Sequence, residues 1–124
     1  MDAVAEGLIC RDPAEIHRLF IISLLKQDID GALSLYHMDA HFVSGPGTTT
    51  VSGHEAVREQ LEVFATIAGD MKLVERTMTV AGDIAQVKMQ WKRASTGEAF
   101  TALDVLQRQD DGRWLFLIDN PYGA

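Results

Sequence analysis

The hydrophobic pattern of the 124-residue chain changes its period near residue 70. Before this point, apolar residues recur at the three- to four-residue spacing of amphipathic helices. After it, apolar and polar residues alternate as they do in half-buried strands. Helices followed by a run of strands predict an α+β domain, with the helices packed on one face of an antiparallel sheet.

Three helices are predicted in the first half of the chain. Residues 12–15 read Asp-Pro-Ala-Glu, which combines a helix cap, a proline at the first helical position and a glutamate three residues after the cap. The first helix therefore starts here and ends near Lys26. A second, short helix begins at Asp28 or Asp30 and includes Leu35 and Tyr36, and a third covers residues 55–67.

The strands are predicted from β-branched residues and from alternation. Short strands are expected at residues 41–44 and 48–52, joined by a Gly-Pro-Gly turn that is too short for a phosphate loop. The last two strands form a hairpin, because Asp-Gly between two β-rich segments is a strong turn signal. The longer strands are expected at residues 72–80, 84–92, 102–106 and 114–118.

Composition and charge narrow the class of protein. Apolar residues make up 47% and charged residues 23%, which are ordinary proportions for a globular protein. The length predicts a single domain that spans residues 1–124, with residues 1–11 as a loose lead-in. The net charge of −7, without a basic cluster, argues against nucleic acid and anionic membranes as partners. Cys10 is the single cysteine, and no apolar run approaches the length of a membrane span. We therefore expect a cytoplasmic protein.

Two carboxylates interrupt the apolar residues of the last hairpin. Asp104 lies within the first strand, and it either faces a pocket with a raised pKa or pairs with a cation near the surface. Asp119 has the same parity as Leu115 and Leu117, and it could lie diagonally from Asp104 on one face. The two carboxylates would then push their pKa values apart. Alternatively, Asp119 only satisfies backbone groups where the strand ends.

Four short motifs follow one another in an order that resembles the NTF2-like superfamily. They are Asp-Ile-Asp at residues 28–30, residues 36–42, Gly-His-Glu at residues 53–55, and Asp-Gly-Arg-Trp at residues 111–114. The resemblance covers roughly residues 13–123 and is closest to the SnoaL-like and ketosteroid-isomerase-like branch.

The resemblance implies a cone-shaped, cystatin-like fold. Three N-terminal helices would pack on a curved antiparallel sheet, with a pocket between the first helix and the concave face. It also implies a homodimer formed through the sheet. The superfamily includes isomerases, dehydratases, epoxide hydrolases, polyketide cyclases and non-catalytic binding domains, so the fold alone does not decide the function.

The steroid isomerases of this superfamily use a carboxylate base, a tyrosine and a protonated carboxylic acid. Counting along the chain places the base at Ser44, the tyrosine at Phe20 and the acid at Asp104. Serine cannot take a carbon-bound proton unaided, and phenylalanine has no hydroxyl. The standard steroid isomerase mechanism is therefore not expected.

Histidines offer another route to proton transfer, since dehydratases of this superfamily use a His–Asp pair. Either His41 or His17 could partner Asp104, and our predicted catalytic set is Asp104, His41 and Asp119. Each histidine could instead be an ordinary surface or core residue. The spacing of the histidines does not indicate a metal site, and no cofactor is expected.

These observations predict a pocket protein that binds a small, apolar, oxygen-bearing molecule, with Asp104 as polar anchor. It would either catalyse a proton transfer, such as isomerisation, dehydration or cyclisation, or act as a non-catalytic ligand-binding or dimerisation domain. A polar face on the strand at residues 84–92 favours the interface role. The side chains predicted to contact the ligand are Phe20, Phe42, Ser44, Phe64, Met89, Trp91, Leu117 and Tyr122.

Overall fold

The computed structural model describes residues 8–45 and 49–123, and it confirms the α+β class. The helical elements are η1 (Pro13–Glu15), α2 (Ile16–Leu25), α3 (Ile29–Leu33), α4 (His54–Ala65) and η2 (Ala68–Asp70). The strands are β1 (Tyr36–Val43), β2 (Thr50–Ser52), β3 (Met71–Ala81), β4 (Ile84–Arg93), β5 (Ala99–Arg108) and β6 (Trp114–Asn120). No helix in the described parts of the chain has the length and apolar character needed to cross a membrane. The predicted turn at residues 45–47 falls partly outside the described residues.

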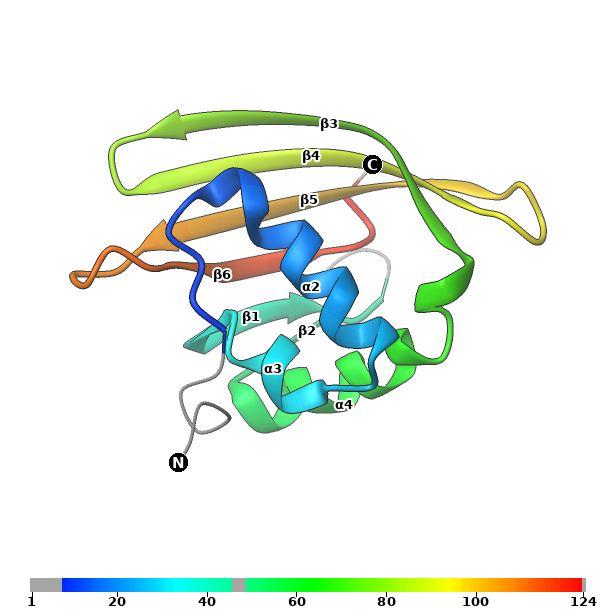
Figure 1. Cartoon of the computed structure of the whole chain (residues 1–124), viewed down its shortest axis with the longest axis horizontal. Helices are drawn as coiled ribbons and strands as arrows, with labels where there is room; N and C mark the ends of the chain where they lie inside the picture. Colours follow the sequence, from blue (N-terminus) through cyan, green and yellow to red (C-terminus); the bar gives the residue numbers. More distant parts are fainter. Residues whose placement is uncertain (1–7, 46–48, 124) are drawn as a thin grey trace.

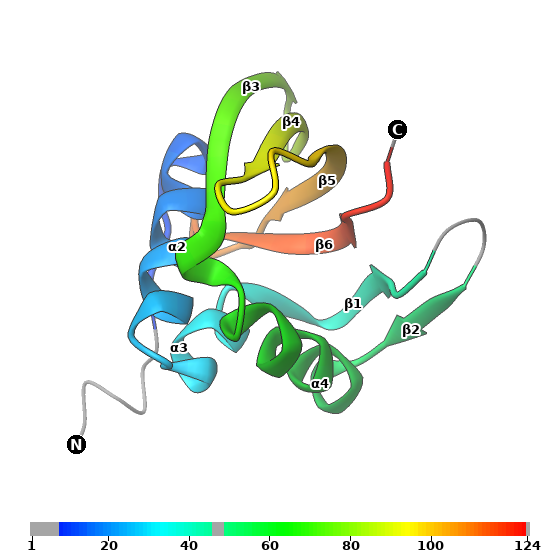
Figure 2. The same ribbon diagram turned by 90° about the vertical axis from the view of Figure 1, so that its right-hand side faces the viewer.

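One six-stranded sheet has the order β2-β1-β6-β5-β4-β3. All neighbouring strands are antiparallel, as predicted, except β1 and β6, which run parallel. A parallel pair needs a long crossover, and here the whole chain between β1 and β6 supplies it. Helix α2 lies across one face of the sheet, and the β3 end of the sheet curls round towards α2 (Figures 1 and 2).

Helix α2 is fixed at its start and along its buried face. The Asp12 side chain accepts a hydrogen bond of 2.9 Å from the backbone N–H of Ala14, which caps the first turn. That turn is the 3₁₀ helix η1 rather than part of the α-helix. Ile16, Phe20 and Leu24 then recur every four residues and are all buried, so this face packs on the sheet.

Two segments differ from the sequence-based expectation. Tyr36 begins strand β1 instead of ending the second helix, because it pairs with Phe116 across the parallel ladder. The described part of the expected loose lead-in is tied to the core. The carbonyl of Cys10 accepts a 2.7 Å hydrogen bond from the N–H of Trp114, and the Cys10 side chain is buried.

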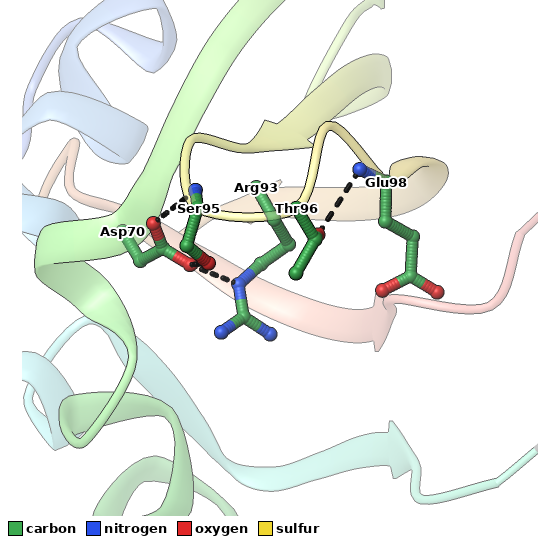
Figure 3. Close-up of polar contacts among 5 residues, drawn as sticks. All are labelled: Asp70, Arg93, Ser95, Thr96 and Glu98. Atoms are coloured by element: carbon green, nitrogen blue, oxygen red, sulfur yellow. Dashed lines mark hydrogen bonds and ion pairs between the residues drawn. The ribbon is translucent and has the colours of Figure 1, made fainter.

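The turn between β4 and β5 is held by one carboxylate, Asp70, at the end of η2 (Figure 3). Its Oδ2 accepts from Arg93 Nε at 2.7 Å and from the Ser95 hydroxyl at 2.6 Å, and its Oδ1 accepts from the Ser95 N–H at 2.8 Å. Within the turn, the Thr96 hydroxyl accepts from the N–H of Glu98 at 3.1 Å. This cluster joins the turn to the helical segment before β3.

Candidate functional site

A buried histidine–aspartate pair joins helix α2 to strand β5. His17 Nε2 lies 2.8 Å from Asp104 Oδ2, and the side chains are only 4% and 3% exposed. His17 follows Ile16 on the buried face of α2, and Asp104 alternates with the buried residues Ala102 and Leu106 on β5. The concave face of the sheet therefore presents a carboxylate to the helix that covers it.

A β-bulge places Asp119 directly opposite Asp104. Val105 pairs with Ile118, but Leu106 pairs with Phe116, so Leu117 has no partner in the β5–β6 ladder. The extra residue shifts the parity of β6, and Asp119 becomes the register partner of Asp104. The expected diagonal placement, with Asp119 on the face of Leu117, was therefore wrong, although the two carboxylates do lie together.

Tyr36 and the backbone complete the hydrogen bonds of the two carboxyl groups. The Tyr36 hydroxyl donates to Asp119 Oδ2 at 2.5 Å, and both side chains are buried. The backbone N–H of Asn120 donates to Asp104 Oδ1 at 3.2 Å. His17, Asp104, Asp119 and Tyr36 thus form a continuous buried chain of ionisable groups, which we call the buried quartet.

Burial dominates the electrostatics of the buried quartet. Loss of hydration raises the pKa of Asp104 to about 7, although hydrogen bonds from Asp119 and from the Asn120 N–H lower it. Loss of hydration, and then the charge of Asp104, raise the pKa of Asp119 well above its ordinary value. Burial lowers the pKa of the His17 imidazole to about 4. The pKa of His17 makes its imidazole neutral at neutral pH, and the raised pKa of Asp119 favours its protonated form.

These protonation states give each oxygen of Asp104 a donor. When Asp104 is ionised, it accepts from His17 Nε2–H, from the Asn120 N–H and from the protonated Asp119 carboxyl. His17 Nδ1 then carries a lone pair, and this buried atom has no hydrogen-bond partner within the part of the chain that the structure describes.

An apolar cavity of about 40 Å³ lies beside the buried quartet. His17, Asp104 and Asp119 are the polar members of its lining. On the same measure one water needs roughly 10–15 Å³, so the cavity holds about three waters or a small part of a ligand. The apolar lining includes Phe20, Phe64, Met89, Trp91, Phe100 and Phe116.

Comparison with known proteins identifies the family. The model of the SnoaL-like domain matches residues 16–116. The chain belongs to the SnoaL-like domain family. The comparison with curated proteins gave no match.

Solved structures share the fold of this SnoaL-like domain at low sequence identity. An NTF2-like protein of unknown function from Pseudomonas putida has a TM-score of 0.69 at 18% identity, with 96% of this chain and 86% of that chain covered. A candidate ketosteroid isomerase from Shewanella frigidimarina has a TM-score of 0.70 at 17% identity, with 88% and 94% covered. A protein of unknown function from Mycobacterium tuberculosis has a TM-score of 0.67 at 20% identity, with 86% and 70% covered. At these identities the likeness shows the fold alone.

The SnoaL-like domain brings together only part of the predicted catalytic set. Asp104 and Asp119 are partners, but His41 is exposed on β1 and does not join them. His41 pairs with Ile118, whereas the next residue, Phe42, pairs with Asp119, so His41 lies on the opposite face of the sheet.

Half of the predicted ligand-contacting residues line the cavity, namely Phe20, Phe64, Met89 and Trp91. The other four do not belong to its lining. Phe42 is buried in the core and packs on Phe64 with ring centroids 5.7 Å apart, and Tyr122 is 48% exposed. Ser44 bonds through its N–H to the carbonyl of Thr49. Leu117 is the bulge residue of β6.

Two polar residues of the site were missed or undervalued in the sequence. His17 is a possible partner of Asp104 in the sequence but lies outside the predicted catalytic set, although it follows Ile16 on the face of α2 that the apolar spacing predicts to be buried. Arg76 is absent from the predicted site, although it shares the parity of Met78 in an alternating strand. The comparison with the steroid isomerases pointed to Phe20 as the site residue of the first helix. The α2 side chain that contacts Asp104 is instead that of His17, one turn earlier.

Proposed function

We propose that this SnoaL-like domain binds a small, apolar, oxygen-bearing molecule beside the buried quartet and catalyses a proton transfer, as in an isomerisation, dehydration or cyclisation. Asp104 exchanges the proton, Asp119 adjusts its ionisation, and His17 holds it through a hydrogen bond. The observation that supports this proposal is the buried His17–Asp104 contact of 2.8 Å in the lining of an apolar cavity.

The chemistry follows from the protonation states. A pKa of about 7 allows Asp104 to take up and release a proton near neutral pH, as efficient acid–base catalysis requires. Ionised Asp104 would take the proton from a C–H bond next to a carbonyl of the ligand. The electron pair of that bond moves onto the carbonyl oxygen and gives an enolate. In an isomerisation, protonated Asp104 then returns the proton to a different carbon of the enolate, whose electrons form the new C–H bond while the C=O bond re-forms. Asp119 keeps its own proton throughout and holds Asp104 in place.

A non-catalytic ligand-binding or dimerisation domain is the alternative. The small volume of the cavity, about 40 Å³, and the complete set of donors around ionised Asp104 favour it. In that case the buried quartet would only specify how α2 docks on the sheet. A homodimer through the outer face of the sheet is compatible with either function, and analytical ultracentrifugation would test it.

Deuterium exchange into a model ketone tests the catalytic proposal without knowledge of the substrate. The protein would be incubated with 2-tetralone in D2O at pH 8, and the loss of its α-proton signals followed by NMR. We expect the native protein to accelerate exchange, and Asp104→Asn to reduce that acceleration by about 100-fold or more. Asp83→Asn, which removes a carboxylate paired with Arg108 on the surface, is the matched control and should leave the rate unchanged.

Two results would count against the catalytic proposal. They are the absence of acceleration by the native protein, and an equal rate in Asp104→Asn. A thermal-shift screen against neutral planar ligands separates the alternatives. A ligand at one hundred times its Kd adds about 2.7 kcal/mol to the free energy of unfolding. Stabilisation by such a ligand without exchange activity would support the non-catalytic binding domain.

A further inference from the structure

A larger open groove adjoins the cavity, between α2 and the strands β3 and β4. Its volume is about 460 Å³, which lies within the range of roughly 300–1,000 Å³ that is usual for small-molecule sites. A ligand that occupies the groove can therefore extend past His17 towards the cavity. The residues that line both spaces are His17, Ile21, Met71 and Trp91.

Arg76 places a guanidinium group in this groove. In the β3–β4 ladder Arg76 pairs with Met89 and Met78 pairs with Val87. Met89 and Val87 are buried on the concave face, so Arg76 stands on that face and is half-buried. Arg76 also lies close enough to affect His17. Burial is the main cause of the lowered pKa of His17, and the positive charge of Arg76 lowers it further.

Arg76 differs from the other arginines in its partners. No hydrogen bond or ion pair joins Arg76 to another residue within residues 8–45 and 49–123. A half-buried guanidinium has five N–H donors, and it favours an acceptor that is also shielded from water. The arginines that do donate to protein oxygens are Arg11, Arg18, Arg58, Arg93, Arg108 and Arg113.

We propose that the ligand carries a carboxylate, which Arg76 binds while the apolar body of the ligand lies along the groove beside His17 and Trp91. This inference rests on the proposed function, since it names the ligand class of the same site. A single planar guanidinium matches a carboxylate through two parallel hydrogen bonds. The chain carries a net charge of −7, so recognition would depend on this short-range contact rather than on long-range attraction.

Binding of a matched ligand pair tests the inference. Naphthalene-2-carboxylate and naphthalene-2-carboxamide have the same apolar body, and only the first carries a charge. Their Kd values can be measured by NMR from the indole N–H signal of Trp91, which lines the groove, with the signal of buried Trp114 as an internal reference. In the native protein the carboxylate should bind about tenfold more tightly than the carboxamide.

Two arginine variants locate the source of that preference. Arg76→Gln should remove the preference and leave the affinity for the carboxamide within about twofold. Arg18→Gln is the matched control, because Arg18 also borders the groove but already pairs with Glu15. It should keep the preference.

The outcomes separate this inference from the proposed function. Equal binding of the two ligands, or a preference that survives Arg76→Gln, overturns the carboxylate inference and leaves the ligand site in place. Failure of both ligands to bind the native protein overturns the inference together with the proposed ligand site. Asp104→Asn should reduce the acceleration of deuterium exchange into 2-tetralone by about 100-fold or more yet keep the preference for the carboxylate, which would show that Arg76 binds independently of the proton transfer.

Discussion

Two aspartate clusters at different depths of the same sheet respond to their surroundings in opposite ways. At the β4–β5 turn, Asp70 is partly exposed, and hydrogen bonds from Ser95 and Arg93 lower its pKa. Between β5 and β6, burial raises the pKa of Asp104 to about 7 and the pKa of Asp119 well above its ordinary value.

The number of donors does not explain this difference. Asp70 accepts three hydrogen bonds, and ionised Asp104 accepts from His17, Asn120 and Asp119. The two carboxylates differ in their contact with water and in the charge of their partners. Asp70 has a guanidinium partner and contact with solvent, whereas the partner of Asp104 is a neutral imidazole in an apolar wall. Donors keep a carboxylate ionised at the surface, but in the core they only reduce the effect of desolvation. A carboxylate in the core, such as Asp104, can therefore exchange a proton near neutral pH.

The largest expected effect is a pH-dependent stability that originates in Asp104. Its folded pKa of about 7 exceeds the unfolded value of about 3.9, so between these values the folded state binds more protons and stability falls as the pH rises. Asp104→Asn removes this contribution. The free energy of unfolding of the native protein, relative to Asp104→Asn, should fall by about 1.4 kcal/mol per pH unit between pH 5 and pH 7 and then level off.

Urea unfolding at several pH values measures this difference. His17 contributes with the opposite sign, because its folded pKa of about 4 lies below the unfolded value of about 6.5, so its contribution to stability rises between pH 4 and pH 6.5. The comparison with Asp104→Asn subtracts the His17 contribution as long as the variant keeps its buried, neutral imidazole. The free energy of unfolding of Asp83→Asn should change with pH as that of the native protein does. If the native protein and Asp104→Asn also showed the same pH dependence from pH 5 to pH 8, Asp104 would ionise in the folded protein as it does in the unfolded chain.

Tyr36→Phe should have the next largest effect. The change removes the donor to Asp119 Oδ2 but keeps the ring, which packs on Phe116 with centroids 4.7 Å apart. A buried acceptor left without its donor costs about 1–3 kcal/mol. Urea unfolding at pH 6 gives the loss, and Tyr122→Phe, at a tyrosine that is 48% exposed, should change stability by less than about 0.5 kcal/mol. An unchanged stability in Tyr36→Phe would mean that the bond to Asp119 does not help to hold the buried quartet together.

Local chemistry explains which features of the fold could be predicted from the sequence. The helix start at residues 12–15 and the hairpin turn around Gly112 depend on residues within a few positions of one another, and both were predicted correctly. Asp104 stood out because a charge interrupts an alternating apolar strand. Gly112 has a φ of 89°, which glycine tolerates and most other residues do not.

The rest of the site depends on contacts that no local pattern records. The bulge at Leu117 turns Asp119 towards Asp104, and it arises from how β6 fits between β5 and the parallel strand β1. The choice between His17 and His41 was decided by the rotation of α2 and by the parity of β1. Arg76 is a candidate because β3 places it in the groove beside α2, and the sequence does not show which strand borders that helix.

Asp70→Asn should affect stability less than Tyr36→Phe does, and its pH dependence should run in the direction opposite to that of Asp104. The folded pKa of Asp70 lies below its unfolded value, so its stabilisation is present above about pH 4 and is lost as the pH falls through the folded pKa. At neutral pH, Asp70→Asn should lower the melting temperature by less than Tyr36→Phe does. Added salt should shrink the effect, because Arg93 and Asp70 are 27% and 24% exposed. Ser95→Ala, which removes only the hydroxyl donor, should have a smaller effect still. A salt-independent loss as large as that of Tyr36→Phe would mean that Asp70 behaves like a buried carboxylate, and the contrast between the two clusters would then not depend on depth.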